Sequence, residues 1–267
     1  MYENEFLSSK INQKEMWAGF APSALFTTPV AAKLLRFSGF LKNEKILDIG
    51  TGTGVVAITA SRMGANVCAI DLTPELLLQA KEDAKIANQK NINWIEGDAE
   101  FLPFEDNCFN LVISQFGHMF APRPKKVVDE IFRVLCPGGK VVFATWPPEH
   151  LMGKLFRYIQ NNLRNKHFFF KPELWGNPSV IERRLKKKFE IPIFLRGVMI
   201  TPALSVSHRR LAFEKSFGPL KNLLNSVIEQ PEKILKIQKD LDKLISSYFS
   251  ENLIHQDYIF TKAKVKK

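Results

Sequence analysis

The stretch at residues 45–56 constrains the fold more than any other part of the chain. It reads KILDIGTGTGVV, so that an apolar run ends at an acid, Asp48, before glycines at Gly50, Gly52 and Gly54. An amphipathic segment begins immediately afterwards. Glycine allows a tight turn and lets a ligand approach the backbone, and the start of a helix presents free N–H groups to that ligand. The pattern predicts a strand, a ligand-binding turn and a helix.

Short apolar segments alternate with helical segments through the first 150 residues. We expect strands at residues 46–49, 66–71, 91–96, 110–115 and 140–146, and helices at 55–62, 73–88 and 124–135. Five such alternations with short connections require a parallel sheet that has helices on both faces. In this scheme Gly39 ends an earlier helix, and the Thr73 side chain caps the helix that follows the second strand. The sequence therefore predicts an α/β fold.

Two further acids fall where such a sheet binds its ligands, at the carboxyl ends of the strands. Asp71 lies 71 − 50 = 21 positions after Gly50, close to the spacing of about 20 for a ribose-binding acid. Its carboxylate can accept from both ribose hydroxyls, and the alternative is a helix-capping or solvated aspartate. Asp98 can accept from an amino group such as that of adenine, and the alternative is an ordinary turn residue. Together these acids predict a nucleoside pocket.

The spacing of the glycines indicates which nucleoside is bound. A turn that binds pyrophosphate reads GxGxxG, whereas this chain has GxGxG with Asp48 two positions ahead of Gly50. An acid beside the turn repels a diphosphate and suits a ligand with an ammonium group. This argues against a dinucleotide-dependent oxidoreductase.

Several segments, in order over about residues 44–146, resemble the class I S-adenosylmethionine-dependent methyltransferases. The resembling segments are residues 47–54 for motif I, 69–72 for the ribose-binding strand, 97–104 for the adenine segment, 109–114 for the fourth strand and 133–140 for the turn into the fifth. The run DAEFLPF at residues 98–104 is most similar to the methyltransferase type 11 branch, which includes ubiquinone and menaquinone biosynthesis methyltransferases. The resemblance implies S-adenosylmethionine as cofactor and S-adenosylhomocysteine as product.

The resemblance also implies the residues that hold this cofactor. They are Asp48, Gly50, Thr51, Gly52 and Gly54 at the methionine end, Asp71 at the ribose, Leu72, Asp98 and Ala99 at the adenine, Ser114 and Gln115 at the floor near the sulfonium, and Trp17 as a cover. For Trp17 the alternative is a core tryptophan. The family fold implied is a Rossmann-like, doubly wound, mostly parallel seven-stranded sheet. Its last strand, here residues 252–264, would run antiparallel between strands five and six.

The implied reaction is transfer of an activated methyl group to an O, N or C atom of a small molecule by in-line displacement, driven mainly by positioning. His118, just past the fourth strand, is the best-placed candidate for a general base, with His150 a weaker one. The alternative is that His118 only hydrogen-bonds in a loop or packs beside the cofactor. No Asn/Asp-Pro-Pro-Tyr/Phe motif and no Pro-Cys nucleophile follows that strand, which disfavours methylation of nucleic-acid bases. No metal-binding spacing is present.

We expect one methyltransferase domain over residues 1–267, with three parts. Residues 1–40 form N-terminal cap helices, 41–146 the cofactor-binding core, and 147–267 a half-sheet with a helical insertion at about 205–247. Residues 151–267 carry a net charge of +13, from 23 basic and 10 acidic residues. A solvated surface explains this charge, and the alternative is an RNA or protein methyltransferase that uses the basic part. A non-catalytic S-adenosylmethionine-binding module is the other alternative.

Three cysteines without a CxxC pair, no secretory signal and no membrane-spanning run predict a cytoplasmic protein. Nothing in the sequence indicates the oligomeric state.

Overall fold

The computed structural model describes residues 10, 12–163 and 171–266 and centres on one mixed sheet. Its strands are β1 (Lys45–Ile49), β2 (Asn66–Asp71), β3 (Ile92–Glu96), β4 (Phe109–Gln115), β5 (Leu135–Thr145), β6 (Ile193–Pro202), β7 (Phe249–Ser250) and β8 (Leu253–Lys264). The order is β3-β2-β1-β4-β5-β8-β6, and β7 pairs with β8 beside this path. The seven expected strands are all present, and the two-residue β7 is an eighth that the sequence did not indicate.

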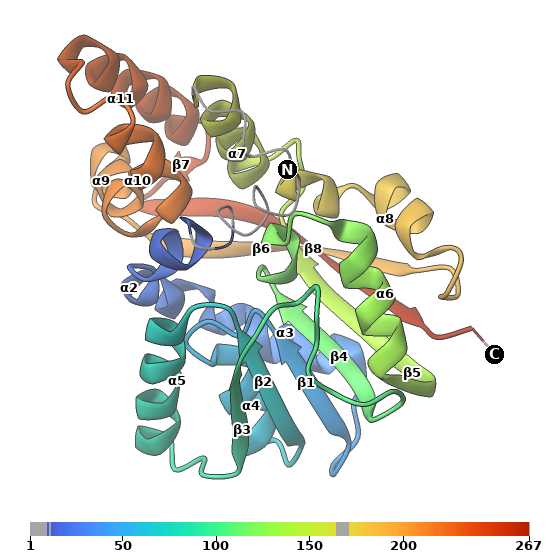
Figure 1. Cartoon of the computed structure of the whole chain (residues 1–267). Helices are drawn as coiled ribbons and strands as arrows, with labels where there is room; N and C mark the ends of the chain where they lie inside the picture. Colours follow the sequence, from blue (N-terminus) through green and yellow to red (C-terminus); the bar gives the residue numbers. More distant parts are fainter. Residues whose placement is uncertain (1–9, 11, 164–170, 267) are drawn as a thin grey trace.

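Helices cover both faces of this sheet. The helices of the described residues are α2 (Ala21–Ala24), α3 (Thr28–Ser38), α4 (Val55–Arg62), α5 (Pro74–Ile86), α6 (Pro124–Val134), α7 (Leu151–Asn162), α8 (Pro178–Leu185), α9 (Val206–Ser216), α10 (Gly218–Asn225) and α11 (Pro231–Ser246), with 3-10 turns η1 (Leu25–Thr27), η2 (His118–Phe120) and η3 (Pro172–Gly176). Figure 1 shows α3 and α4 on one face and α6 and α8 on the other. Within the described residues, no helix has the length and apolar character needed to cross a membrane.

The middle of the sheet holds the core because its strands are apolar on both faces. Strand β1 is buried from Ile46 to Ile49, and the last five residues of β5 are all buried. Parallel strands covered by helices on both sides have this continuous apolar character. β1 pairs in parallel with β2 and β4, so the ends of these strands, with Asp48, Asp71 and Gln115, meet at one edge.

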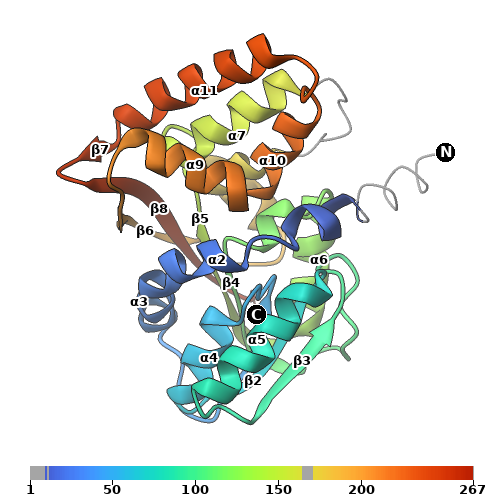
Figure 2. The ribbon, with the colours of Figure 1, turned by 90° about the vertical axis from the view of Figure 1, so that its left-hand side faces the viewer.

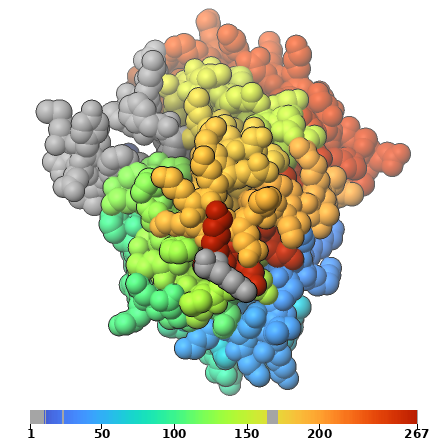
Figure 3. Space-filling view, turned by 90° about the vertical axis from the view of Figure 1, so that its right-hand side faces the viewer, coloured from blue at the N-terminus to red at the C-terminus, as the bar shows by residue number. Residues whose placement is uncertain are grey.

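The C-terminal strand lies antiparallel between β5 and β6, as the resemblance implied. Val142 of β5 pairs with Lys262 of β8, which in turn pairs with Ile193 of β6. Figure 3 shows the red C-terminal segment emerging between the green and the orange parts of the chain. Between β6 and β8 the chain leaves the sheet for a long helical excursion and then returns to it as β8.

That excursion consists of α9, α10 and α11, which gather with α7 beyond the carboxyl ends of the parallel strands (Figures 1 and 2). Their contacting faces are apolar, with Leu220, Leu223 and Leu241 almost fully buried. The insertion observed, Val206–Ser246, agrees with the expected 205–247. It therefore stands over the edge of the sheet where the strand-end acids meet.

Two expectations about helix ends have different outcomes. Gly39 ends α3 in the left-handed conformation, at φ 62°, as expected for a glycine cap. The Thr73 side chain does not cap α5, contrary to expectation. Its backbone N–H donates to Asp71 Oδ1 at 2.9 Å and its hydroxyl also interacts with the Asp71 carboxylate, so the hydroxyl is directed to that acid and not to the first turn of α5. Asp71 thus accepts a hydrogen bond from a backbone N–H of this turn.

Candidate active site

The glycine turn after β1 uses each of its glycines for a different reason. Gly50, Gly52 and Gly54 all have positive φ, at 64°, 56° and 79°, a conformation that side chains rarely adopt. A Cβ at Gly54 would also lie 2.6 Å from the Trp94 ring, whereas a Cβ at Gly52 would meet no atom within 4 Å. The turn therefore packs its third glycine against the protein and leaves its second open to the pocket.

A fourth glycine, Gly117, supports the turn from the neighbouring loop after β4. A Cβ on Gly117 would lie 2.4 Å from the carbonyl oxygen of Gly50, and one on Gly50 would lie 2.8 Å from Gly117 Cα. The two backbones are therefore in direct contact, which only glycine at both positions permits. The sequence reasoning missed Gly117, because its partner is 67 positions away and no spacing rule connects the two.

Asp48 is buried at the end of β1, with 1% of its surface exposed. Its Oδ2 accepts a hydrogen bond from Thr51 Oγ1 at 2.6 Å, while its Oδ1 has no hydrogen-bond partner among the described residues. Burial raises the pKa of Asp48 to about 7, against the hydrogen bond from Thr51 and with help from the nearby charge of Asp71. The site thus holds a carboxylate that lacks one partner and would be stabilised by a cation.

Asp71 organises the turn rather than standing free. Its Oδ2 accepts from the Gly52 N–H at 2.7 Å and its Oδ1 from the Thr73 N–H at 2.9 Å. Burial raises the pKa of Asp71, and these backbone hydrogen bonds oppose the rise. Each carboxylate oxygen has a second lone pair, so the two bonds leave acceptor capacity for a ligand's hydroxyls.

Asp98 has a partner that the sequence analysis did not anticipate. Its Oδ2 pairs with the Lys10 ammonium, and its Oδ1 accepts from the Glu100 N–H at 2.9 Å. Glu100 is itself buried and accepts from Arg123 Nε at 2.8 Å. The helical N-terminal segment, residues 10 and 12–17, thus contacts the carboxyl edge of the sheet through an ion pair.

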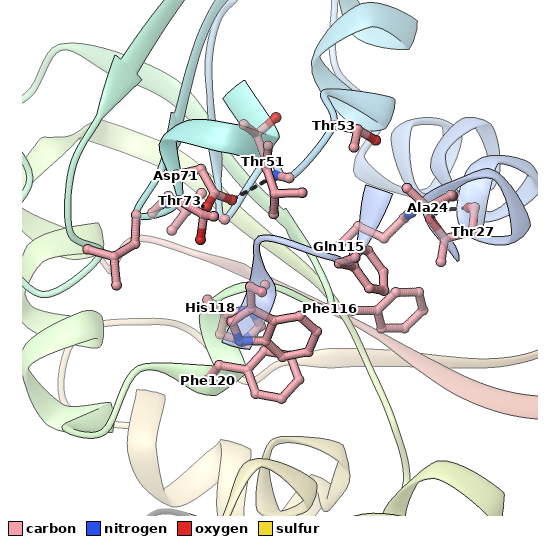
Figure 4. Close-up of a pocket in the computed structure, with 18 of the residues that line it drawn as sticks. Ala24, Thr27, Thr51, Thr53, Asp71, Thr73, Gln115, Phe116, His118 and Phe120 are labelled. Atoms are coloured by element: carbon pink, nitrogen blue, oxygen red, sulfur yellow. Dashed lines mark hydrogen bonds between the residues drawn. The ribbon is translucent and has the colours of Figure 1, made fainter. Parts of the chain in front are cut away.

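One continuous pocket contains most of the predicted residues. The predicted residues that line it are Trp17, Asp48, Gly50, Thr51, Gly52, Asp71, Leu72, Asp98, Ala99, Gln115 and His118. In Figure 4, Thr51, Asp71 and Thr73 lie on one side of this space, and Phe116, His118 and Phe120 lie on the opposite side. The pocket also reaches Arg209, Phe213 and Phe217 of the insertion and its boundary. Folding therefore joins the glycine turn to a second part of the same pocket, the second chamber, which is lined largely by aromatic residues.

Two predicted residues do not line the pocket, for structural reasons. Gly54 faces Trp94 instead. Ser114 is fully buried, and its hydroxyl donates to Ile49 O at 2.6 Å and accepts from His118 N at 3.0 Å. Ser114 therefore ties the end of β1 to the loop after β4. Its neighbour Gln115 does face the pocket, with Nε2 bound to Thr27 O at 3.1 Å and Oε1 unpaired.

His118 lies in the wall of the pocket but in surroundings that do not suit a general base. Its ring stacks on Phe143 at 4.0 Å and meets Trp175 edge-on at 4.6 Å, and neither nitrogen has a hydrogen-bond partner among the described residues. Burial, with the charge of Arg184, lowers the pKa of His118 to about 3. A base works best with a pKa near the operating pH. The ring is therefore neutral and weakly basic, and the expected base role is not favoured.

Aromatic residues from distant segments enclose the pocket. Trp17 of the N-terminal helix lies 4.5 Å from the Phe120 ring and 6.0 Å from the Phe217 ring, centroid to centroid. Phe116, at an unusual φ of 61°, stacks on Trp146 at 3.8 Å. Trp17 is thus both a packing residue and part of the pocket wall. In the part of the chain that the structure describes, no group of three or more His, Cys, Asp or Glu is arranged to hold a metal ion.

Comparison with known proteins assigns a family to this site. Residues 47–143 match the family described as a methyltransferase domain. A demethylmenaquinone methyltransferase of Thermus thermophilus is 31% identical over 182 residues, which cover 64% of this chain and 78% of that protein. The chain belongs to the class I S-adenosylmethionine-dependent methyltransferases. This methyltransferase accordingly uses S-adenosylmethionine as its methyl donor.

Other relatives of the methyltransferase match nearly its whole length. An uncharacterized protein of Mycobacterium tuberculosis is 30% identical over 94% of this chain and 93% of its own. The YcgJ protein of Bacillus subtilis has the same fold, with a TM-score of 0.60 at 16% identity over 89% of this chain and 98% of that one. Phosphoethanolamine N-methyltransferase 2 of Haemonchus contortus has a TM-score of 0.58 at 22% identity over 90% of this chain and 53% of that one.

Proposed function

We propose that this methyltransferase transfers the methyl group to an O, N or C atom of a small molecule enclosed in the pocket, by in-line displacement and mainly through positioning. The observation that carries the proposal is the continuity of the pocket. One cavity is lined both by the glycine turn and by the aromatic residues around the insertion. A methyl donor bound at the glycine turn and an acceptor bound among the aromatic residues would lie in the same cavity. No conformational change would then be needed to bring them together.

The part of the pocket at the glycine turn suits the cofactor, because it has an unpaired polar atom and an open stretch of backbone. Asp48 Oδ1 lacks a partner and suits an ammonium group, and the open side of Gly52 lets a ligand reach the backbone. Asp71 would take the ribose hydroxyls, Leu72 and Ala99 would flank the adenine, and Asp98 would meet its amino group beside Lys10. S-adenosylmethionine supplies an activated methyl group when bound. The chain would orient the acceptor, exclude water and stabilise charge.

A small acceptor is supported over RNA or protein by the way the basic residues are used. Two members of the most basic run, residues 183–188, already make internal contacts: the Arg184 guanidinium lies 4.4 Å from the Trp175 ring centre, and Lys188 pairs with Asp129 at 2.6 Å. The Thermus relative is named a demethylmenaquinone methyltransferase, after an acceptor that is neither RNA nor protein. We also propose that the whole chain acts as one domain, since its N-terminal helix, core and insertion all line the pocket, and that it is cytoplasmic, since its cysteines are free thiols.

The cofactor assignment predicts ligand stabilisation. S-adenosylhomocysteine at 100 times its Kd should raise the free energy of unfolding by about 2.7 kcal/mol, measured as a shift of the thermal midpoint, whereas NAD should cause no shift. Asp71→Asn should remove most of the effect, and its remaining oxygen can still accept from one of the two backbone N–H groups. A shift with NAD and none with S-adenosylhomocysteine would contradict the assignment.

The acceptor class needs its own measurement. Labelled S-adenosylmethionine incubated with the enzyme and a cell extract should label the small-molecule fraction. Label confined to RNA or protein would contradict the proposal. RNA binding that weakened steeply with salt would then identify RNA as the acceptor. No label in any fraction would favour a non-catalytic binding module.

A further inference from the structure

The second chamber of the pocket contains a buried arginine. Arg209 of α9 is 6% exposed, lines the pocket, and has no carboxylate within ion-pair distance among the described residues. Its Nη2 donates to Gln256 Oε1 at 3.2 Å, and its Nε has no partner. The guanidinium carbon lies 4.2 Å from the Phe213 ring centre and 5.4 Å from that of Phe26. The charge is therefore held by one neutral amide and two aromatic faces.

The neighbouring residue shows what a satisfied arginine looks like on the same helix. Arg210 pairs with Glu214 at 2.7 Å and Asp242 at 2.8 Å, away from the pocket. Burial lowers the pKa of Arg209 to about 10, whereas the carboxylates beside Arg210 raise its pKa. Arg209 is still charged at pH 7, and a buried charge without a partner is costly. An anion in the chamber would remove that cost.

The rest of the chamber limits the charge and shape of that anion. Among the described residues that line the pocket, the other cationic side chain is that of Lys10, which already pairs with Asp98 and Glu100. His118 is neutral, as described above. One uncompensated positive charge balances one negative charge, so a doubly charged phosphate would leave a buried excess. Apolar side chains make up much of the rest of the wall, among them Phe116, Trp146, Met152, Met199, Phe213 and Phe217.

We propose that the methyl acceptor is a small apolar or aromatic monocarboxylate whose carboxylate pairs with Arg209. This rests on the proposed function, since it names the substrate class of the same site. A guanidinium offers a fork of N–H donors that matches a carboxylate, and the Gln256 amide lies beside it. Arg209 then determines specificity by holding the acid end of the acceptor, while the aromatic chamber holds its body. The transferred methyl goes to another part of the molecule.

The test compares acids with their neutral isosteres. Benzoate, phenylacetate and 2-naphthoate are each paired with the corresponding primary amide, and Kd is measured by calorimetry with the enzyme saturated with S-adenosylhomocysteine. In the wild type the carboxylates should bind at least about tenfold more tightly than their amides, since hydrogen bonds to charged groups contribute about 1.5–3 kcal/mol. Arg209→Gln should bring the ratio close to one. Arg209→Lys should keep part of it.

The control is Arg210→Gln, the same substitution one position along α9, where the side chain pairs with acids outside the pocket. It should leave the ratio unchanged. If no carboxylate binds the wild type more tightly than its amide, or if phenyl phosphate binds more tightly than every carboxylate, the inference is wrong. The wild-type comparison holds even if a variant fails to fold. Failure of S-adenosylhomocysteine itself to bind is a different result, because it contradicts the proposed function.

Discussion

Asp48→Asn is expected to make the ligand-free protein more stable and its cofactor binding at least about 100-fold weaker. The asparagine keeps an oxygen and a side chain of the same size beside Thr51 but has no charge. Truncating a buried charge pair costs about 3–5 kcal/mol, and each 1.4 kcal/mol is a tenfold change in Kd. The loss of binding follows because the ammonium group of the cofactor would have no anionic partner. Calorimetry with S-adenosylhomocysteine measures it.

The gain in stability depends on pH in a definite direction. Burial raises the pKa of Asp48 from 3.8 to about 7, so the fold favours the protonated acid. Its stabilising contribution is complete below pH 3.8 and is lost as the pH rises through about 7. The variant is neutral at every pH, so its advantage should be on the order of 1–4 kcal/mol at pH 8 and should shrink toward pH 4. Chemical unfolding at several pH values tests this.

The same ionisation should control cofactor affinity in the wild type. Between pH 5.5 and 7, affinity for S-adenosylhomocysteine should fall by up to about tenfold for each unit of acidification, because the ammonium group pairs with the ionised form. In Asp48→Asn the profile should be flat. Asp83→Asn on α5, outside the pocket, is the matched control and should retain the wild-type profile. Wild-type affinity that did not change with pH would mean that Asp48 does not meet the ammonium group.

Gly117→Ala is expected to be among the most destabilising single methyl additions in this chain. The new Cβ would lie 2.4 Å from the Gly50 carbonyl oxygen and 2.8 Å from the Gly50 Cα. Both are backbone atoms of a turn tied down by Ser114 and Asp71, so the clash cannot be relieved by rotating a side chain. Overpacking of this kind costs about 1–3 kcal/mol and sometimes more. We expect about 3 kcal/mol and weakened cofactor binding.

Two other glycines make the comparison specific. Gly19→Ala adds a methyl where no atom lies within 4 Å and φ is not positive, and it should change stability by less than about 0.5 kcal/mol. Gly52→Ala adds one to an open position at φ 56°, so its stability cost should be about 1 kcal/mol, while its methyl faces the cofactor side of the pocket. Equal stability for Gly117→Ala and Gly19→Ala would contradict the contact between the two loops.

The sequence predicted which residues gather at the carboxyl edge of the sheet, because local rules govern that arrangement. A strand, a glycine turn and a helix are adjacent in the chain, and Asp71 follows at a fixed interval set by one strand–helix–strand unit. Parallel pairing then brings Asp48 and Asp71 to one edge. Each step needs only neighbouring residues and the rule that ligands bind at the carboxyl ends of strands.

His118 shows why position along the chain is not enough to assign chemistry. It lies just past β4, where a base was expected, and it does line the pocket. Whether it can take a proton depends on other elements: Phe143 and Trp175 pack on its ring and bury it, and the charge of Arg184 opposes its protonation. Desolvation is a property of the packed interior, so the sequence gives no measure of it.

The sequence by itself determined the parallel sheet, the glycine turn and the position of the helical insertion, because these follow from periodicity and from short-range motifs. The methyl donor was implied by the resemblance of those motifs to a known family. Tertiary structure alone decided which groups are buried and which lack a partner. Arg209 and Arg210 are identical and adjacent in the sequence. Arg210 pairs with acids away from the pocket, whereas Arg209 is enclosed within it. The environment of each depends on segments brought together by folding, and that environment sets what the second chamber can bind.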